Sequence, residues 1–322
     1  MQSKLAQLRA SIDPVTPLFA LVDPMVGEPL PGIGATAVGS DGTDQRAQGW
    51  DRDIVPVPLP KSIALPAHQH PYLIQLRGVD DPLLELTLAI ADEERLTAQC
   101  GGLDGTGRSA HRIGGWLQSS MRWPELGMLI AEMCRVNTEA VTKATYLRLA
   151  DRRVLDLLCH VAGQSRVAAQ FGRLQSWTYL SANGELSRLQ SQREHSERLR
   201  LDETEWQRMQ RGEMLHRAIA HYLGEATFTE TRIQPPTYAS AEPALLLAAD
   251  AALRWPHRFK SDVDHAVCAA LAMWRPSMAD VSTIRVLLDD LGSESEPAEP
   301  LSIVHRDLIT LIQQAEKTAR FD

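Results

Sequence analysis

The sequence of 322 residues has no excess of basic side chains, and this absence limits the partners that we expect. Lys and Arg number 33 against 41 Asp and Glu, so the formal net charge is −8. The Lys and Arg residues are scattered among the acidic residues and form no basic patch in the sequence. Because a nucleic-acid interface normally needs a basic face, we expect no nucleic-acid partner.

Paired cysteines and long apolar runs are also missing. No run reaches the length of about 20 apolar residues that a membrane-spanning helix needs. Gln, Lys and Arg interrupt residues 1–12, where a signal peptide would be apolar. We therefore expect a cytoplasmic protein with no membrane insertion. The cysteines form no CxxC pair, which fits neither a zinc site nor a disulfide scaffold, and all four are expected to be buried, reduced thiols: Cys100, Cys134, Cys159 and Cys268.

The sequence contains no spacing typical of a phosphate-binding loop, a hydrolase nucleophile elbow or a zinc-protease helix. The pair that comes nearest to a metal site is His68 and His70, because alternate residues of a strand share a face. Pro66 and Pro71 make this segment a loop instead, and no third ligand stands at a useful spacing. We assign no catalytic, cofactor-binding or metal-binding residue. A metal-dependent hydrolase that uses His68 and His70 stays as an alternative.

The first half of the chain mixes strand and helix patterns. Residues 27–50 are rich in Gly, Pro and Asp and predict a long surface loop. Pro82 predicts a helix start, with Asp80 or Asp81 as its cap. Asp151 stands at a strand-to-helix turn and predicts a second cap. Strands are predicted over residues 17–22, 53–59, 72–76, 113–117 and 145–149, with 53–59 at a sheet edge because of its prolines.

Residues 177–189 predict a hairpin. Asn183 and Gly184 supply the two positive-φ positions of a type I′ turn. A two-residue loop at this point places Tyr179 opposite Arg188 and Trp177 opposite Gln190.

Strand patterns almost vanish after residue 192. Asp202 and Glu205 have the spacing of a capping box before an amphipathic helix. Further helical patterns cover residues 261–274, 281–291 and 308–315. The predicted fold class is therefore α+β. A mixed α/β lobe with a short-stranded sheet covers residues 1–192, and an all-helical lobe covers residues 193–322.

Several short motifs follow one another in a characteristic order between residues 17 and 190. The order resembles the adaptor (chaperone) family that loads effectors in type VI secretion, although Arg152 replaces the proline of that family's pattern. The resemblance rests on Phe19-Ala-Leu-Val-Asp23, Trp116-Leu117-Gln118-Ser119, Leu147-Arg148 with Asp151-Arg152-Arg153-Val154-Leu155, Phe171-Gly172, and Trp177 to Gly184.

The resemblance implies a non-enzymatic adaptor without a cofactor. Its partners would be a secreted toxic effector, bound in the cytoplasm, and the spike protein of the type VI apparatus. A helical protein-binding scaffold that acts only through its C-terminal lobe is a further alternative. The family-motif or partner-binding candidates are Asp23, Trp116, Arg148, Asp151, Arg153, Trp177 and Gly184.

Overall fold

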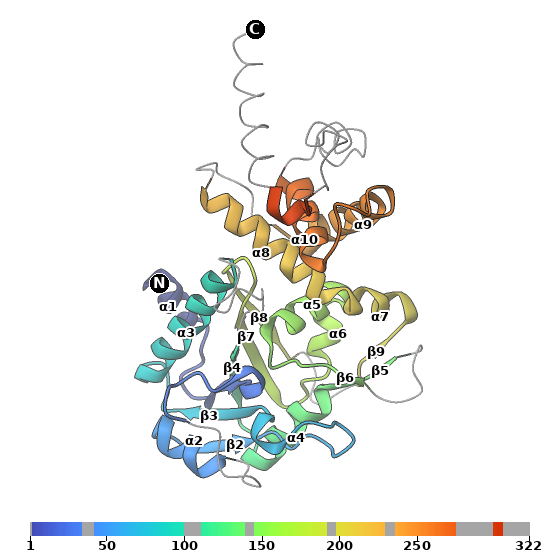
Figure 1. Cartoon of the computed structure of the whole chain (residues 1–322). Coiled ribbons are helices and arrows are strands. Elements are labelled where there is room, and N and C mark those ends of the chain that lie inside the picture. The colour runs from blue at the N-terminus through green and yellow to red at the C-terminus, as the bar shows by residue number, and fades with distance from the viewer. Residues whose placement is uncertain are drawn as a thin grey trace. The chain divides into compact units, whose positions relative to one another are not determined.

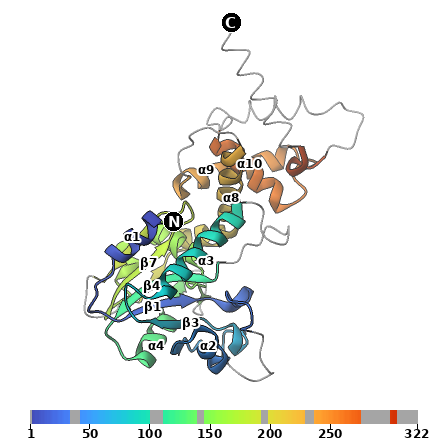
Figure 2. The same ribbon diagram turned by 90° about the vertical axis from the view of Figure 1, so that its left-hand side faces the viewer.

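The computed structural model describes residues 2–33, 42–99, 111–138, 145–191, 198–228, 236–274 and 299–304. The chain forms two compact units, the first over residues 1–98 and 102–210 and the second over residues 211–322 together with 99–101 (Figures 1 and 2). The first unit contains a mixed sheet-and-helix fold and the second is helical where it is described. The predicted α+β class is confirmed.

A six-stranded antiparallel sheet forms the centre of the first unit, in the order β2-β3-β1-β4-β7-β8 (Figure 1). All residues of β1 and β4 are buried, which explains why β1 is an apolar run without polar alternation. The predicted strands at 17–22, 72–76 and 113–117 are confirmed. The proline-containing strand predicted over 53–59 lies at an edge as expected, but it covers only residues 54–56. The strands are β1 (Leu18–Val22), β2 (Ile54–Pro56), β3 (Tyr72–Leu76), β4 (Ile113–Ser119), β7 (Leu174–Leu180) and β8 (Leu186–Gln190).

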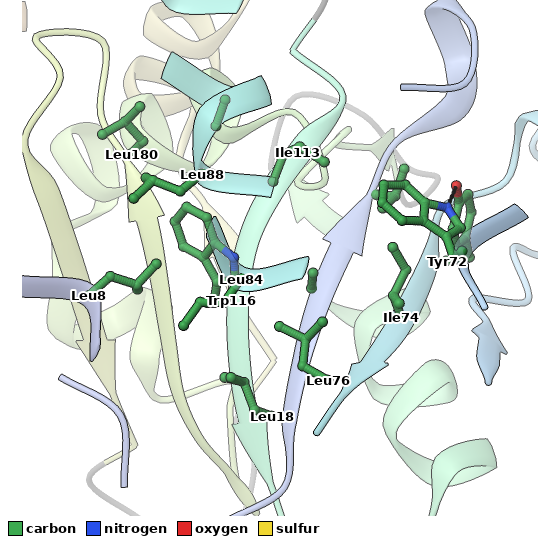
Figure 3. Packing of buried hydrophobic residues seen from close by; sticks show 14 of the residues in the cluster. Leu8, Leu18, Tyr72, Ile74, Leu76, Leu84, Leu88, Ile113, Trp116 and Leu180 are labelled. Atoms are coloured by element: carbon green, nitrogen blue, oxygen red, sulfur yellow. Dashed lines mark hydrogen bonds between the residues drawn. The ribbon is translucent and has the colours of Figure 1, made fainter. Parts of the chain in front are cut away.

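Helices α1 (Gln2–Ala10) and α3 (Pro82–Gln99) contribute to the hydrophobic core on one face of this sheet. Figure 3 shows Leu8, Leu84 and Leu88 around Trp116 of β4. Helix α3 starts at Pro82, and Asp81 Oδ1 accepts a hydrogen bond from Leu83 N at 2.9 Å, so Asp81 is one of the two caps that the sequence offered.

The opposite face of the sheet carries α5 (Arg152–Ala162) and α6 (Gln164–Ala168). Tyr179 Oη of β7 donates to Asp156 Oδ1 of α5 at 2.9 Å. Trp177 lies on the same face as Tyr179, next to Phe171. The two faces of the sheet are therefore covered by different helices, α1 and α3 on one face and α5 and α6 on the other.

The expected surface loop over 27–50 is wrong for residues 43–50, which form α2 (Thr43–Trp50). This helix has no continuous apolar stripe, so its periodicity gave no signal. It is anchored instead by single side chains. Trp50 is buried, and its Nε1 donates to Tyr72 Oη at 3.0 Å. Two short 3-10 helices flank the region, η1 (Pro24–Val26) and η2 (Ala67–Gln69), and residues 34–41 of the expected loop lie outside the described residues.

The hairpin forms as predicted, but its register differs by one residue. Tyr179 pairs with Ser187, and Trp177 pairs with Leu189. The loop spans 181–185 because Ser181 N donates to Glu185 O at 2.9 Å, and Gly184 alone of the expected pair has a positive φ, at 84°. Ser181 Oγ and Asn183 Oδ1 both accept from Glu185 N, and these side-chain bonds stabilise the longer loop.

A second sheet in the first unit has the order β6-β5-β9. Its strands are β5 (Arg135–Thr138), β6 (Thr145–Tyr146) and β9 (Arg200–Leu201), so the predicted strand over 145–149 is shorter than expected. Helix α4 (Trp123–Met133) leads into β5. Helix α7 (Glu203–Gln210) contacts α5, so the first unit continues beyond residue 192, where the composition changes.

The predicted capping box at Asp202 and Glu205 is confirmed at the start of α7. Glu205 N donates to Asp202 Oδ1 at 2.8 Å, and Asp202 N donates to Glu205 Oε2 at 3.0 Å. The helical pattern that begins here is divided between two helices, because α7 ends at Gln210 and α8 begins at Gly212.

The second unit contains α8 (Gly212–Phe228), α9 (Tyr238–Arg254) and α10 (Asp262–Trp274), which pack on one another. The predicted helix over 261–274 is confirmed as α10. Buried Asp264 accepts from Ser302 N and from Ser261 N, both at 2.8 Å, and so holds residues 299–304 against α10. The helices predicted over 281–291 and 308–315 lie outside the described residues. In the described ranges, no helix has the length and apolarity to cross a membrane.

Candidate functional site

Four of the seven family-motif residues meet in the first unit: Asp23, Arg148, Asp151 and Arg153. Asp23 follows β1, and its backbone N donates to Arg112 O at 2.7 Å, which extends the pairing beyond the strand. Arg148 lies in the turn before α5, and its Nε donates to Asp23 Oδ2. Its Nη1 lies 3.8 Å from Asp151 Oδ2. The guanidinium of Arg148 therefore lies between the carboxylates of Asp23 and Asp151, which are 128 positions apart in the sequence.

Asp151 is the N-cap of α5, as predicted. Its Oδ1 accepts from Arg153 N at 3.1 Å, which satisfies one of the free N–H groups of the first turn. The side chain of Arg153 also returns to the same carboxylate, with Nε to Oδ1 at 3.1 Å and Nη2 to Oδ2 at 2.7 Å. Asp151 thus has two roles, as a helix cap and as the acceptor of a bidentate ion pair.

The two carboxylates differ in their electrostatics. Burial raises the pKa of Asp23 above its usual value, and the attraction of Arg148 offsets this only in part. Burial acts in the same direction on Asp151, but Arg153, His111 and Arg148 together hold its pKa well below the usual range. The difference follows from the number of cations, because Asp151 is next to more positive charge than Asp23.

Three residues that were not among the family-motif candidates extend this group of charges: Glu94, Arg112 and Arg152. Arg152 is 2% exposed, and its Nη1 donates to Glu94 Oε2 at 3.2 Å and to Ile113 O at 3.0 Å. Its Nη2 donates to Ala91 O at 2.6 Å. Glu94 also accepts from Arg112 Nε at 2.8 Å. We call the whole set the α5 charge cluster: Asp23, Glu94, Arg112, Arg148, Asp151, Arg152 and Arg153.

Two glycines of β4 allow close approaches of the backbone, Gly114 to the turn before α5 and Gly115 to β7. A Cβ on Gly114 would lie 2.5 Å from Ala150 O, closer than real contacts allow. Gly115 has φ +131°, and a Cβ there would lie 2.4 Å from Thr178 O. A larger residue at Gly114 would move the turn that carries Arg148 and Asp151, and one at Gly115 would move β7, so Gly114 is the glycine that sets the distance of the α5 charge cluster from β4.

The other three candidates lie away from the cluster. Trp116 is buried among core residues (Figure 3), and its Nε1 donates to Thr87 Oγ1 at 3.0 Å. Trp177 is buried on the other face, with Nε1 donating to Gly114 O at 3.1 Å. Both are core side chains with satisfied indole N–H groups. Gly184 provides the positive φ of the hairpin loop.

Each histidine of the hydrolase alternative makes a contact that involves a backbone carbonyl. His70 Nε2 lies 3.1 Å from Leu65 O, and His68 O accepts from Arg46 Nη2. Within the described part of the chain, no three His, Cys, Asp or Glu residues are grouped so that they could hold a metal ion. The described residues therefore provide no third ligand for this pair.

The three described cysteines are buried, as predicted, and form no disulfide. Burial raises the pKa of each thiol to about 12, which leaves almost no thiolate at neutral pH. They are Cys134, Cys159 and Cys268; Cys100 lies outside the described residues.

The α5 charge cluster has a structural role that its contacts define. Every carboxylate in it accepts from at least one guanidinium. The cluster joins the end of β1, the start of β4, the C-terminal half of α3 and the start of α5. Beside it, Met25 and Val26 of η1 follow Asp23 and are 38% and 50% exposed, so buried charge and exposed apolar side chains are adjacent in the chain.

No protein-family model, no curated protein and no solved structure matches this chain.

Proposed function

We propose that this chain is an adaptor of type VI secretion. It binds a toxic effector in the cytoplasm and assists its loading onto the spike protein. The observation that carries the proposal is the meeting of Asp23, Arg148, Asp151 and Arg153, four residues that the family-like pattern had already singled out. A chance resemblance gives no reason for residues 125 positions apart to form an ion pair.

The chemistry of the α5 charge cluster supports a binding protein more than an enzyme. A general base needs a carboxylate or imidazole that is free to accept a proton from a substrate. The carboxylates of the cluster are instead engaged by arginines, and the neighbouring thiol of Cys134 has a raised pKa. Such a network of ion pairs stabilises one local conformation of the chain, and this fixes the positions of nearby residues that could bind a partner.

The test uses the full-length protein and the genes that adjoin its own. An adjoining toxin gene is co-expressed with the tagged chain, and the complex is isolated by affinity and size-exclusion chromatography. In the source bacterium, deletion of the adaptor should stop secretion of that toxin and leave secretion of other effectors unchanged. Normal secretion of the toxin after deletion, with no complex on the column, would show that the proposal is wrong.

A helical scaffold remains a second candidate because the second unit also exposes apolar side chains. Leu246 and Leu253 of α9 are 54% and 83% exposed. Two matched variants of the full chain separate the candidates. Met25→Asp/Val26→Asp changes the first unit, and Leu246→Asp/Leu253→Asp changes the second. Loss of toxin binding in the second variant alone would favour the scaffold reading.

A further inference from the structure

The two edges of the six-stranded sheet differ in how they end. At one edge β2 is short and contains Pro56, which has no N–H to donate. Helix α4 also lies close to this strand, because a Cβ on Gly127 would lie 2.3 Å from Pro56 O. An added strand therefore finds few donors at β2 and meets a helix close by.

The other edge is β8, and its outward main-chain groups are open. Ser181 N donates to Glu185 O, and Ser191 N donates to Gln175 O, both at 2.9 Å. This alternation places the main-chain groups of Ser187 and Leu189 toward β7. The main-chain groups of the alternate residues point outward, and in the described ranges they have no hydrogen-bond partner: Leu186, Arg188 and Gln190.

Arg188 stands in the middle of this edge, opposite Thr178 of β7. Its side chain is exposed and makes no hydrogen bond or ion pair with another described residue. Among the described residues, Asp13 is an electrostatic neighbour of Arg188: the pKa of Asp13 is lowered mainly by hydrogen bonds from Thr16 and Val15 and only weakly by Arg188. The edge therefore combines open main-chain groups with an uncommitted positive charge.

We infer that β8 is a docking edge for an extended segment of a different protein, which adds a seventh strand and places Asp or Glu opposite Arg188. Main-chain hydrogen bonds would supply the affinity of such strand addition, and the cross-strand pair would supply specificity. A second copy of this chain is a poorer occupant. The register that pairs β8 with β8 over its whole length puts Arg188 opposite Arg188, and like charges directly opposite are destabilising. This inference does not depend on the proposed function.

The first measurement is amide hydrogen exchange on the full-length protein by NMR. In the free protein, the amides of Leu186, Arg188 and Gln190 should exchange fast, whereas those of Ser187 and Leu189 should be protected by β7. The probes are two synthetic heptapeptides of alternating Val and Thr, one with Glu and one with Lys at the centre. The Glu peptide should protect the three outward amides and bind roughly fivefold more tightly than the Lys peptide.

Two variants at position 188 distinguish the contribution of the main-chain N–H from that of the positive charge. Arg188→Pro removes the outward N–H without removing a β7–β8 bond, so both peptides should lose binding. Arg188→Ala keeps the N–H and should bind both peptides with equal affinity. Exchange at Ser187 and Leu189 reports whether the hairpin is intact in each variant. If Arg188→Pro does not fold, N-methylation of alternate peptide amides tests the same bonds from the partner side.

Three results would overturn the inference. Slow exchange at the outward amides of the free protein would mean that the chain covers its own edge. A dimer that is lost on Arg188→Pro would identify a second copy as the occupant. If neither peptide binds, or if binding is unchanged in Arg188→Pro, strand addition at β8 is ruled out.

Discussion

Glu94 and Arg152 form a buried ion pair, with 3.2 Å between the carboxylate Oε2 and the guanidinium Nη1. Glu94 has a second partner in Arg112, whereas the other acceptors of Arg152 are backbone carbonyls. The burial of Arg152 lowers its pKa, and Glu94 opposes this effect. Removal of Glu94 and removal of Arg152 should therefore have different effects on stability.

The ion pair gives the first prediction. Glu94→Leu leaves the guanidinium of Arg152 buried without a carboxylate and should lower the free energy of unfolding by about 3–5 kcal/mol. Arg152→Leu should cost less, because Arg112 still binds Glu94. Urea unfolding of both variants and of the double variant measures the difference. Equal losses in the two single variants would contradict the assigned partners.

Asp151 gives the second prediction. Asp151→Ala removes both the cap and the acceptor of Arg153, so it should cost more than the about 1 kcal/mol of a cap alone. Asp151→Asn and Asp151→Ser keep a capping oxygen but lose the ion pair, and should recover only part of the loss. Full recovery by Asn would mean that capping is the whole contribution. An alanine variant with unchanged stability that fails to bind its partner would instead indicate direct contact.

The opposite pKa shifts of Asp23 and Asp151 give the third prediction. The pKa of Asp151 is lowered on folding, so its contribution to stability is present above the usual Asp pKa of 3.8 and is lost as pH falls toward its folded value. The pKa of Asp23 is raised, so its contribution is present below 3.8 and is lost as pH rises through its folded value.

The two asparagine variants should therefore respond to pH in opposite senses. Between about pH 6 and pH 3, the destabilisation by Asp151→Asn should shrink and that by Asp23→Asn should grow. Chemical unfolding at several pH values measures both. Parallel pH profiles would be inconsistent with the assigned electrostatics.

The glycines of β4 give the fourth prediction. Gly115→Ala combines an unfavourable φ with a contact of 2.4 Å to Thr178 O, whereas Gly163 has φ +88° and open space around it. Gly163→Ala should cost about 1–3 kcal/mol from backbone strain alone. Gly115→Ala should cost distinctly more. Thermal unfolding of the two variants compares strain with and without a steric clash.

The histidine pair gives the fifth prediction. His68→Ala/His70→Ala should lower the free energy of unfolding by only about 0.5–1.5 kcal/mol, because His68 is exposed and half-buried His70 loses one hydrogen bond, to Leu65 O. Elemental analysis of the purified protein should find no stoichiometric zinc, iron or manganese. Retained metal that is lost in the double variant would restore the hydrolase alternative.

Local signals in the sequence predicted much of the first unit. The apolar run ending at Val22 predicted a central strand because both of its faces are buried. Asp81, Asp151 and Asp202 predicted helix starts because capping depends on residues only two or three positions away. Such interactions depend only on neighbouring residues, so they can be predicted without knowledge of the rest of the fold.

The interactions that were missed depend on distant or competing contacts. Helix α2 depends on the burial of Trp50 against Tyr72, which is not visible in a mostly polar segment. The hairpin register depends on Ser181, whose bonds select a longer loop than Asn183 and Gly184 alone indicate. No spacing rule connects Glu94 to Arg152, 58 positions later, so the centre of the cluster required the tertiary structure.

The position of α1 has a consequence for the synthesis of the chain. Its residues Leu5 and Leu8 belong to the same core as Leu180, and the helix contacts β8, which comes late in the sequence of the first unit. At about 5–20 residues per second, the ribosome makes β8 roughly 10–40 seconds after α1. Helix α1 can therefore pack early against partners such as Leu84 and Leu88 of α3, but its packing is complete only when β8 has been made.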